Sequence, residues 1–273
     1  MRLGVILPRT EEGGQPLAAT TLAEGARRIE AAGLDSAWVF DSLGRGFLLP
    51  DPLVALSVAA AVTRTIELGT GVLQVPLRRP VELAHRTLTL HLVSGGRLLL
   101  GVGAGSTAAD FAAVGVDFAS RFRQLDESLA LMRALWTGAR VGEAQLGAPW
   151  PAAAGGPPIL IGSWAGSRWI PRAAREFNGW VASGARSSWR LIREGIARFR
   201  DLGGTRAVLT NVAVRLDAAE PSSTGPDDPF DLVCPRAVAV ERLQHVRELG
   251  FDDVVLVAPR HDADYLKELR ALV

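Results

Sequence analysis

Apolar runs and amphipathic segments alternate along the whole chain, and this alternation constrains the fold more than any other feature of the sequence. Each apolar run is followed by a turn and then by a segment whose apolar residues have helical spacing. Near-continuous apolar runs are typical of strands buried on both faces of a parallel sheet, which helices then cover. The expected strands are residues 4–8, 36–40, 66–71, 97–102, 158–162, 179–182, 207–214 and 253–257.

The expected helices begin and end at ordinary sequence signals. Pro52 falls in the first turn of one helix, and Gly33 directly follows another. The expected helices are residues 22–32, 51–64, 80–93, 119–136, 169–177, 188–202, 236–249 and 262–272.

These eight strand–helix units predict an α/β fold, a single (β/α)8 TIM barrel that spans residues 1–273. A doubly wound parallel sheet is the alternative. Two segments exceed the minimal unit and are expected to be loop insertions. They are residues 138–157 and residues 217–235, and the second is expected to be mobile.

Composition excludes several classes of protein. The chain has 30 basic and 29 acidic side chains, and this balance argues against nucleic acid as the main partner. Cys234 is the single cysteine, which excludes an intrachain disulfide and a multi-cysteine metal site. No apolar run is long enough for a signal peptide or a membrane span. We therefore expect a cytoplasmic protein that binds neither nucleic acid nor membranes.

Few acids, bases or metal ligands follow the expected strands, where a barrel of this kind places its active site. Three of the four histidines (His85, His91 and His245) fall on expected helices, and only His261 follows a strand. Because no histidines or acids have ligand spacing, we expect no metal site.

Two glycine-rich segments follow expected strands and are the main functional signal. Gly101–Gly105 would let the backbone approach a flat ring or a phosphate, and it also fits a dinucleotide fingerprint weakly. Gly162–Arg168 offers serine hydroxyls and backbone N–H groups to an anion, with Arg168 or Arg172 adding charge. An ordinary strand-to-helix turn is the alternative for this second segment. Together they suggest a phosphorylated planar cofactor that carries the chemistry.

Several of these segments resemble the bacterial luciferase-like family, which contains flavin- and deazaflavin-dependent oxidoreductases on a (β/α)8 barrel. The resemblance rests on residues 33–41, 68–73, 76–84, 94–105 and 172–180. It spans about residues 1–215 and returns at the last expected strand.

The resemblance implies that the ring of reduced FMN or coenzyme F420 lies at the C-terminal end of the barrel strands. It also implies a small organic substrate, and it favours neither cofactor. It also implies a non-prolyl cis peptide at or beside Gly71–Val72, and a possible homodimer through barrel helices. The cofactor-binding residues that it implies are Asp41, Gly71, Val72, Gly103, Ala104, Gly105, Gly162, Ser163, Gly166, Ser167 and Arg168.

The chain departs from the family pattern where catalytic groups are expected. Ser42 follows Asp41 where deazaflavin dehydrogenases often carry a histidine, and Ser106 replaces an acid of some members. The catalytic residue is therefore unknown, with Asp41, Arg9 and Arg215 as weak candidates. A catalytically inactive flavin-binding barrel is one alternative function, and an unrelated barrel lyase or isomerase is another. The substrate pocket is expected to be built by residues 9–16, 42–49 and 217–235.

Overall fold

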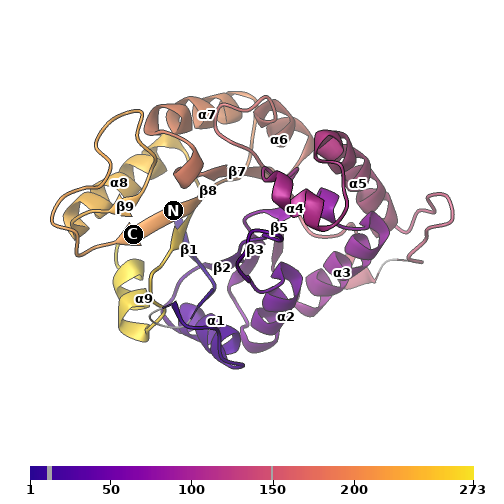
Figure 1. The fold of residues 1–273 in the computed structure, drawn as a ribbon, viewed down its shortest axis with the longest axis horizontal. Coiled ribbons are helices and arrows are strands. Elements are labelled where there is room, and N and C mark those ends of the chain that lie inside the picture. The colour runs from indigo at the N-terminus through magenta and orange to yellow at the C-terminus, as the bar shows by residue number, and fades with distance from the viewer. Residues whose placement is uncertain (11–13, 149) are drawn as a thin grey trace.

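Parallel strands close into a barrel in this computed structural model, which describes residues 1–10, 14–148 and 150–273. Closure is made by β10, which pairs with β1 on one side and with β8 on the other. Because an open sheet would have two edges, this closure confirms the (β/α)8 prediction and shows that the doubly wound alternative is wrong (Figure 1). Within the described residues the eight barrel strands are β1 (Arg2–Ile6), β2 (Ser36–Val39), β3 (Glu67–Thr70), β5 (Leu98–Gly103), β6 (Ile159–Gly162), β7 (Gly179–Ser183), β8 (Ala207–Arg215) and β10 (Asp253–Val257).

Helices form a ring around the strands, as Figure 1 shows. Asp51 begins α2 by accepting hydrogen bonds from the N–H groups of Leu53 and Val54, which would otherwise have no partner. The helices that follow the barrel strands are α1 (Thr21–Ala31), α2 (Pro52–Val62), α3 (Pro80–Val93), α5 (Arg121–Trp136), α6 (Ile170–Glu176), α7 (Trp189–Asp201), α8 (Arg236–Leu249) and α9 (Ala263–Arg270). The short elements α4 (Ala108–Ala113), β4 (Leu73–Gln74) and β9 (Leu232–Val233) were not predicted.

The interior of the barrel is filled by a cluster of apolar side chains, of which Trp38 is the largest. Trp38 is fully buried in the inner apolar cluster, and its indole N–H donates to the hydroxyl of Ser36 at 2.8 Å. A Cβ at Gly69 would lie 2.3 Å from the Trp38 ring, so only glycine leaves room for the indole there. A filled interior leaves ligand sites to the ends of the strands.

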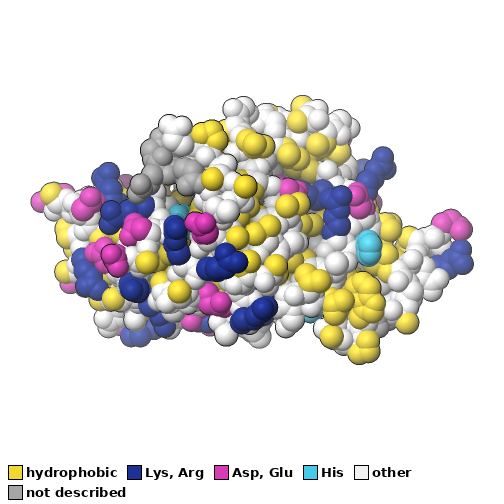
Figure 2. All heavy atoms as spheres, turned by 90° about the horizontal axis from the view of Figure 1, so that it is seen from below, with side chains coloured by type: hydrophobic (Ala, Val, Ile, Leu, Met, Phe, Trp, Pro, Cys, Tyr) yellow, Lys and Arg dark blue, Asp and Glu magenta, His cyan; other side chains and the backbone are white. Residues whose placement is uncertain are grey.

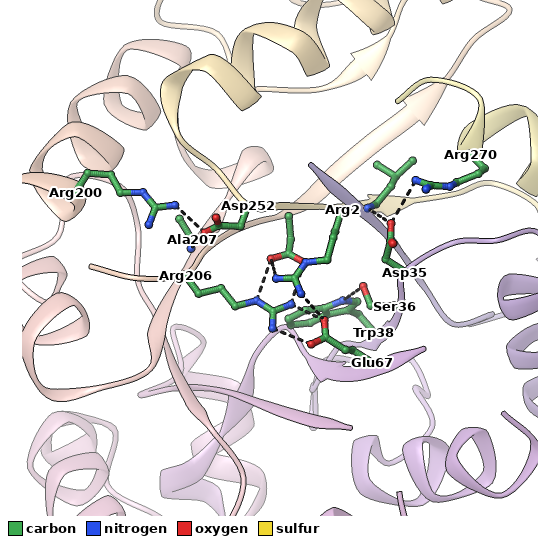
Figure 3. Close-up of polar contacts among 12 residues, drawn as sticks. Arg2, Asp35, Ser36, Trp38, Glu67, Arg200, Arg206, Ala207, Asp252 and Arg270 are labelled. Carbon is green, nitrogen blue, oxygen red and sulfur yellow. Dashed lines mark hydrogen bonds and ion pairs between the residues drawn. The ribbon is translucent and has the colours of Figure 1, made fainter. Parts of the chain in front are cut away.

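Charged side chains close the N-terminal end of the barrel, as Figure 3 shows. Arg206 binds Glu67 at 2.5 and 2.9 Å and Asp253 at 3.0 Å, and Arg2 contacts the same two carboxylates. Burial opposes ionisation of Glu67, but its hydrogen bonds to Arg206 hold its pKa below the ordinary value. Each buried charge therefore has an opposite charge beside it.

The two insertions lie at opposite ends of the barrel. Residues 138–157 connect α5 to β6 at the N-terminal end and include residue 149, which lies outside the described residues. Residues 217–235 lie at the other end, where β9 adds to β8 and the side chain of Phe230 is fully buried. Arg242 of α8 binds the Asp231 carbonyl oxygen of this segment at 2.9 Å. These residues of the segment are thus packed and hydrogen-bonded, and its mobility stays a prediction.

None of the helices in the described part of the chain is both long and apolar enough to cross a membrane.

Candidate functional site

The C-terminal ends of the barrel strands surround an apolar floor, and we call this end the barrel mouth. Phe40, Val72 and Val257 follow or end three different strands and pack on the inner cluster around Trp38. All three side chains are half-buried, so each presents apolar surface above the filled interior. An apolar floor of this kind suits the face of a planar ring.

The cis peptide that the resemblance implies is present between Gly71 and Val72. The Val72 side chain then lies against the ends of β5 and β6. A Cβ at Gly103 would lie 2.8 Å from Val72, and one at Gly162 would lie 2.4 Å from it. These two glycines therefore make room for Val72, a role that their predicted approach to a cofactor did not include.

Asp41 lies at the mouth, but both of its carboxylate oxygens are engaged. Arg78 binds them at 2.6 and 2.9 Å, and the backbone N–H of Gln74 donates to the first at 2.8 Å. Only 2% of the Asp41 side chain is exposed. This arrangement fits a structural anchor for the loop after β3 better than a proton donor.

Gln74 continues this network to a second buried carboxylate. Its side-chain amide donates to the Asp41 carbonyl at 3.1 Å and to Asp110 at 2.9 Å, and Arg45 binds both oxygens of Asp110. Burial opposes ionisation of Asp110, but the hydrogen bonds from Arg45 and Gln74 hold its pKa below the ordinary value. The loop after β2 is thereby fastened to α4. The predicted glycine Gly105 lies beside this network, since a Cβ there would be 2.7 Å from Gln74.

The other two catalytic candidates are exposed. The guanidinium of Arg9 lies 5.6 Å from the centre of the Phe40 ring and forms no ion pair within the described residues. Arg215 ends β8 and lies 3.6 Å from Asp217, with 61% of its side chain exposed. Neither is held in the geometry of a proton donor. Residues 11–13 of the predicted substrate loop lie outside the described residues.

His261, which follows β10, is engaged by the backbone. Its Nε2 lies 2.7 Å from the carbonyl oxygen of Ile6, so this nitrogen carries the proton and donates. Burial lowers the pKa of His261. The ring links the ends of β10 and β1.

The predicted anion segment after β6 keeps some of its groups free. The Ser163 hydroxyl accepts from the Trp180 indole at 3.0 Å, and the Ser167 hydroxyl accepts from the N–H of Trp169 at 3.0 Å. Arg168 is exposed and lies 5.8 Å from the Phe122 ring, with no ion pair to any described residue. Ala104 and Gly166, which are also predicted contacts, follow β5 and β6 respectively.

Arg172 does not contribute to this segment. It binds Asp126 at 2.5 Å and Glu176 at 2.9 Å on the outer surface. Of the two arginines proposed from the sequence, Arg168 is therefore the one available to an anion.

Sequence reasoning missed the polar side of the mouth. Asn211 of β8 donates to the hydroxyls of Ser183 at 3.2 Å and Thr210 at 3.3 Å. Thr210 in turn donates to the carbonyl of Ala182 at 3.1 Å. The signal in the sequence was an asparagine in the middle of a mainly apolar strand. No cluster of histidines, cysteines or acids that could hold a metal occurs in the part of the chain that the structure describes.

Comparison with known proteins identifies the family. The sequence model of the luciferase-like monooxygenases matches residues 1–222, so the chain belongs to this family.

Three known proteins are similar to parts or to the fold of this chain. The 4-hydroxyprotoasukamycin monooxygenase of Streptomyces nodosus subsp. asukaensis is 37% identical over 116 residues, which cover 42% of this chain and 31% of that protein. An F420-dependent glucose-6-phosphate dehydrogenase of Amycolatopsis mediterranei is 38% identical over 124 residues, which cover 42% and 37%. The match thus spans about a third of the length of these relatives. A type II Baeyer–Villiger monooxygenase of Pseudomonas putida, solved with FMN, superposes with a TM-score of 0.75 and 17% identity, covering 98% of this chain and 96% of that one.

Proposed function

We propose that the protein is an oxidoreductase that uses reduced FMN or coenzyme F420 on a small organic substrate. The observation that carries the proposal is the half-buried apolar floor of Phe40, Val72 and Val257 at the barrel mouth. When bound, the ring supplies hydride transfer or, with FMN, oxygen activation. The carboxylate of Asp41 at the mouth is fully engaged by Arg78 and Gln74, which agrees with a cofactor that carries the chemistry.

The residues of the chain would bind and orient the cofactor. The three apolar side chains of the floor would pack against one face of the ring and exclude water from it. Arg168 would hold the phosphate together with nearby backbone N–H groups, because it has no competing ion pair among the described residues. Asp41 would act indirectly, by fixing the loop that begins at Val72 through Arg78 and Gln74.

Similar proteins support both cofactors. One relative is named for its dependence on F420, and one structural neighbour was solved with FMN. Titration of the purified protein with each cofactor, followed by fluorescence, tests the proposal. Saturable micromolar binding of one cofactor alone identifies it, and binding of neither contradicts the proposed function.

The phosphate site has its own test. Arg168→Ala is expected to weaken binding of the cofactor by about 1.5–3 kcal/mol, the effect of a charged hydrogen bond. Arg172→Ala is the matched control, because Arg172 is held by Asp126 and Glu176 outside the mouth. Equal dissociation constants for both variants and the wild type would remove Arg168 from the site.

A catalytically inactive cofactor-binding barrel is the second candidate function. It is favoured by the engagement of both Asp41 oxygens, which leaves this carboxylate unavailable for proton transfer. Tight binding of reduced cofactor without its oxidation by oxygen or by a panel of small carbonyl compounds and alcohols would support this second function.

We further propose a cytoplasmic homodimer in which a second copy covers α2. This helix has no charged residue, although it lies on the outer wall and 62% of Val54 is exposed. Figure 2 shows this wall, with charged side chains crowded toward the side of α1 and α9 and mainly apolar surface in the middle, where α2 lies. Light scattering at several concentrations measures the assembly.

A further inference from the structure

β8 contains an irregularity at the barrel mouth. Asn211 has φ 57°, and it is the only non-glycine residue with positive φ in the described parts of the chain. Leu209 pairs with Val254 and Val212 pairs with Leu256, so three steps along β8 match two along β10. This is a β-bulge, a feature that changes the direction of side chains and is common beside active sites. Asparagine adopts the left-handed conformation more readily than other non-glycine residues.

The bulge determines which side chains of β8 face the barrel axis. Leu209 and Val212 belong to the outer core, between the strands and the helices. The two residues between them therefore both face the axis, although regular alternation would allow only one. Thr210 confirms this orientation, because a Cβ at Gly71 on the opposite wall would lie 3.5 Å from its methyl group. Asn211 reaches Ser183, which follows the inward-facing Val181 by two residues.

Asn211 and Ser183 leave one acceptor and one donor free at this place. The Asn211 amide nitrogen donates to Ser183 and Thr210, while its Oδ1 accepts from no group of the described residues. The Ser183 hydroxyl accepts from Asn211 and donates to no group within those same residues. Both side chains are half-buried, so a ligand can reach them and water is partly excluded. The mouth therefore has an apolar floor with a hydrogen-bonding pair on one side.

We infer that Asn211 and Ser183 bind the pyrimidine edge of the ring cofactor, an inference that rests on the proposed function. The isoalloxazine and deazaisoalloxazine rings both carry an N–H group between two carbonyls on this edge. Asn211 Oδ1 would accept from the N–H group, and the Ser183 hydroxyl would donate to a neighbouring carbonyl. The apolar remainder of the ring would lie over Phe40, Val72 and Val257. This pair therefore orients the ring and selects for an imide edge.

Variants that preserve the bulge test the inference. Asn211→Gly removes the side chain but keeps a residue that tolerates positive φ. Ser183→Ala removes the donor without touching the bulge. Asn178→Gly is the matched control, because Asn178 is the other asparagine of the chain and binds the N–H of Ile159 at the N-terminal end. Fluorescence titrations with FMN and with coenzyme F420 give dissociation constants, and absorption spectra of the bound ring report its hydrogen bonds.

We expect Asn211→Gly and Ser183→Ala each to raise the dissociation constant of the bound cofactor about 3- to 10-fold, the effect of one neutral hydrogen bond. Both should also shift the absorption band of the bound ring, while Asn178→Gly should change neither property. If FMN binds, 3-methyl-FMN adds a check, since its imide has no N–H. The ratio of the dissociation constant of 3-methyl-FMN to that of FMN should be larger for the wild type than for Asn211→Gly.

Two different failures are distinguishable. If the wild type binds neither cofactor, the proposed function is wrong and this inference falls with it. If the wild type binds and both variants bind equally well with unchanged spectra, only the inference is wrong. Should Asn211→Gly fail to fold by circular dichroism, Ser183→Ala alone decides the outcome.

Discussion

The two ends of the barrel satisfy their buried polar groups in different ways. At the N-terminal end, Arg2 and Arg206 meet Glu67 and Asp253 in a closed set of ion pairs. At the mouth, Asp41 and Asp110 are also neutralised by arginines, but the Oδ1 of Asn211 at the edge of the apolar floor accepts from no group of the described residues. The difference suggests that the first end stabilises the barrel and that the second keeps hydrogen-bonding capacity for a ligand.

Arg206→Leu should remove the central ion pairs at the N-terminal end of the barrel. Of the variants considered, it should lower the free energy of unfolding most. It leaves Glu67 and Asp253 buried with Arg2 as their remaining partner, and removal of one partner from a buried ion pair costs about 3–5 kcal/mol. Urea denaturation measures this free energy of unfolding. The dissociation constant of the cofactor should remain that of the wild type in the folded fraction. A variant as stable as the wild type would show that the N-terminal ion pairs do not carry the stability.

Asp110→Asn should have a smaller effect, at the mouth. The substitution weakens the hydrogen bonds of Arg45 and Gln74 to a fully buried carboxylate, at a cost of about 1–3 kcal/mol. The loop after β2 should then separate from α4 more often. Trypsin cleavage after Arg45 should become faster, whereas cleavage at Arg133 in α5 provides the reference rate. Equal cleavage rates in both proteins would argue against the fastening role of Asp110.

Low pH should weaken the ion pairs at the N-terminal end of the barrel, because Glu67 becomes protonated. Its pKa is lower in the folded protein than in the unfolded chain, so its contribution to stability is present above the unfolded pKa and is lost as pH falls through the folded pKa. Glu67→Gln should therefore lower the free energy of unfolding at pH 7, and the difference from the wild type should disappear in strong acid. Urea denaturation across a pH series measures both. A difference that does not vary with pH would contradict this electrostatic account.

Val54→Arg should have the smallest effect on folding, because an exposed substitution changes the free energy of unfolding by about 0.5 kcal/mol or less. It should nevertheless convert the proposed homodimer to a monomer in light scattering. Arg64→Ala, which removes an exposed charge just beyond α2, is the matched control and should remain dimeric. A dimeric Val54→Arg variant would exclude α2 from the interface.

The sequence predicted the barrel because its signals are local. Pro80 and the apolar spacing after it placed α3 at its observed bounds, and residues 254–257 formed an unbroken apolar run. The short elements α4 and β9 were missed, since six and two residues are too few for a periodic pattern. Tertiary contacts, rather than local preference, hold both in place.

The site was less predictable, because its important contacts join residues far apart in the chain. Nothing local to Asp41 indicates that Arg78 will occupy both of its oxygens, or that Gln74 will link it to Asp110. The bulge at Asn211 depends on pairing with β10 and leaves no periodic trace. The cis peptide at Gly71–Val72, by contrast, was placed correctly through the family resemblance.

The bulge also divides β8 into two parts, in which the side chains alternate between the two faces in opposite phase. Before Asn211, the odd-numbered residues Ala207 and Leu209 face the helices, and after it the even-numbered Val212 and Val214 do. Loss of Asn211 would restore regular alternation and leave the later side chains on their present sides, whereas straightening of the bulge at full length would turn Arg215 toward the helices and Val214 toward the open mouth. A substitution that straightened β8 at this point would thus alter the wall of the mouth more than removal of the extra residue would.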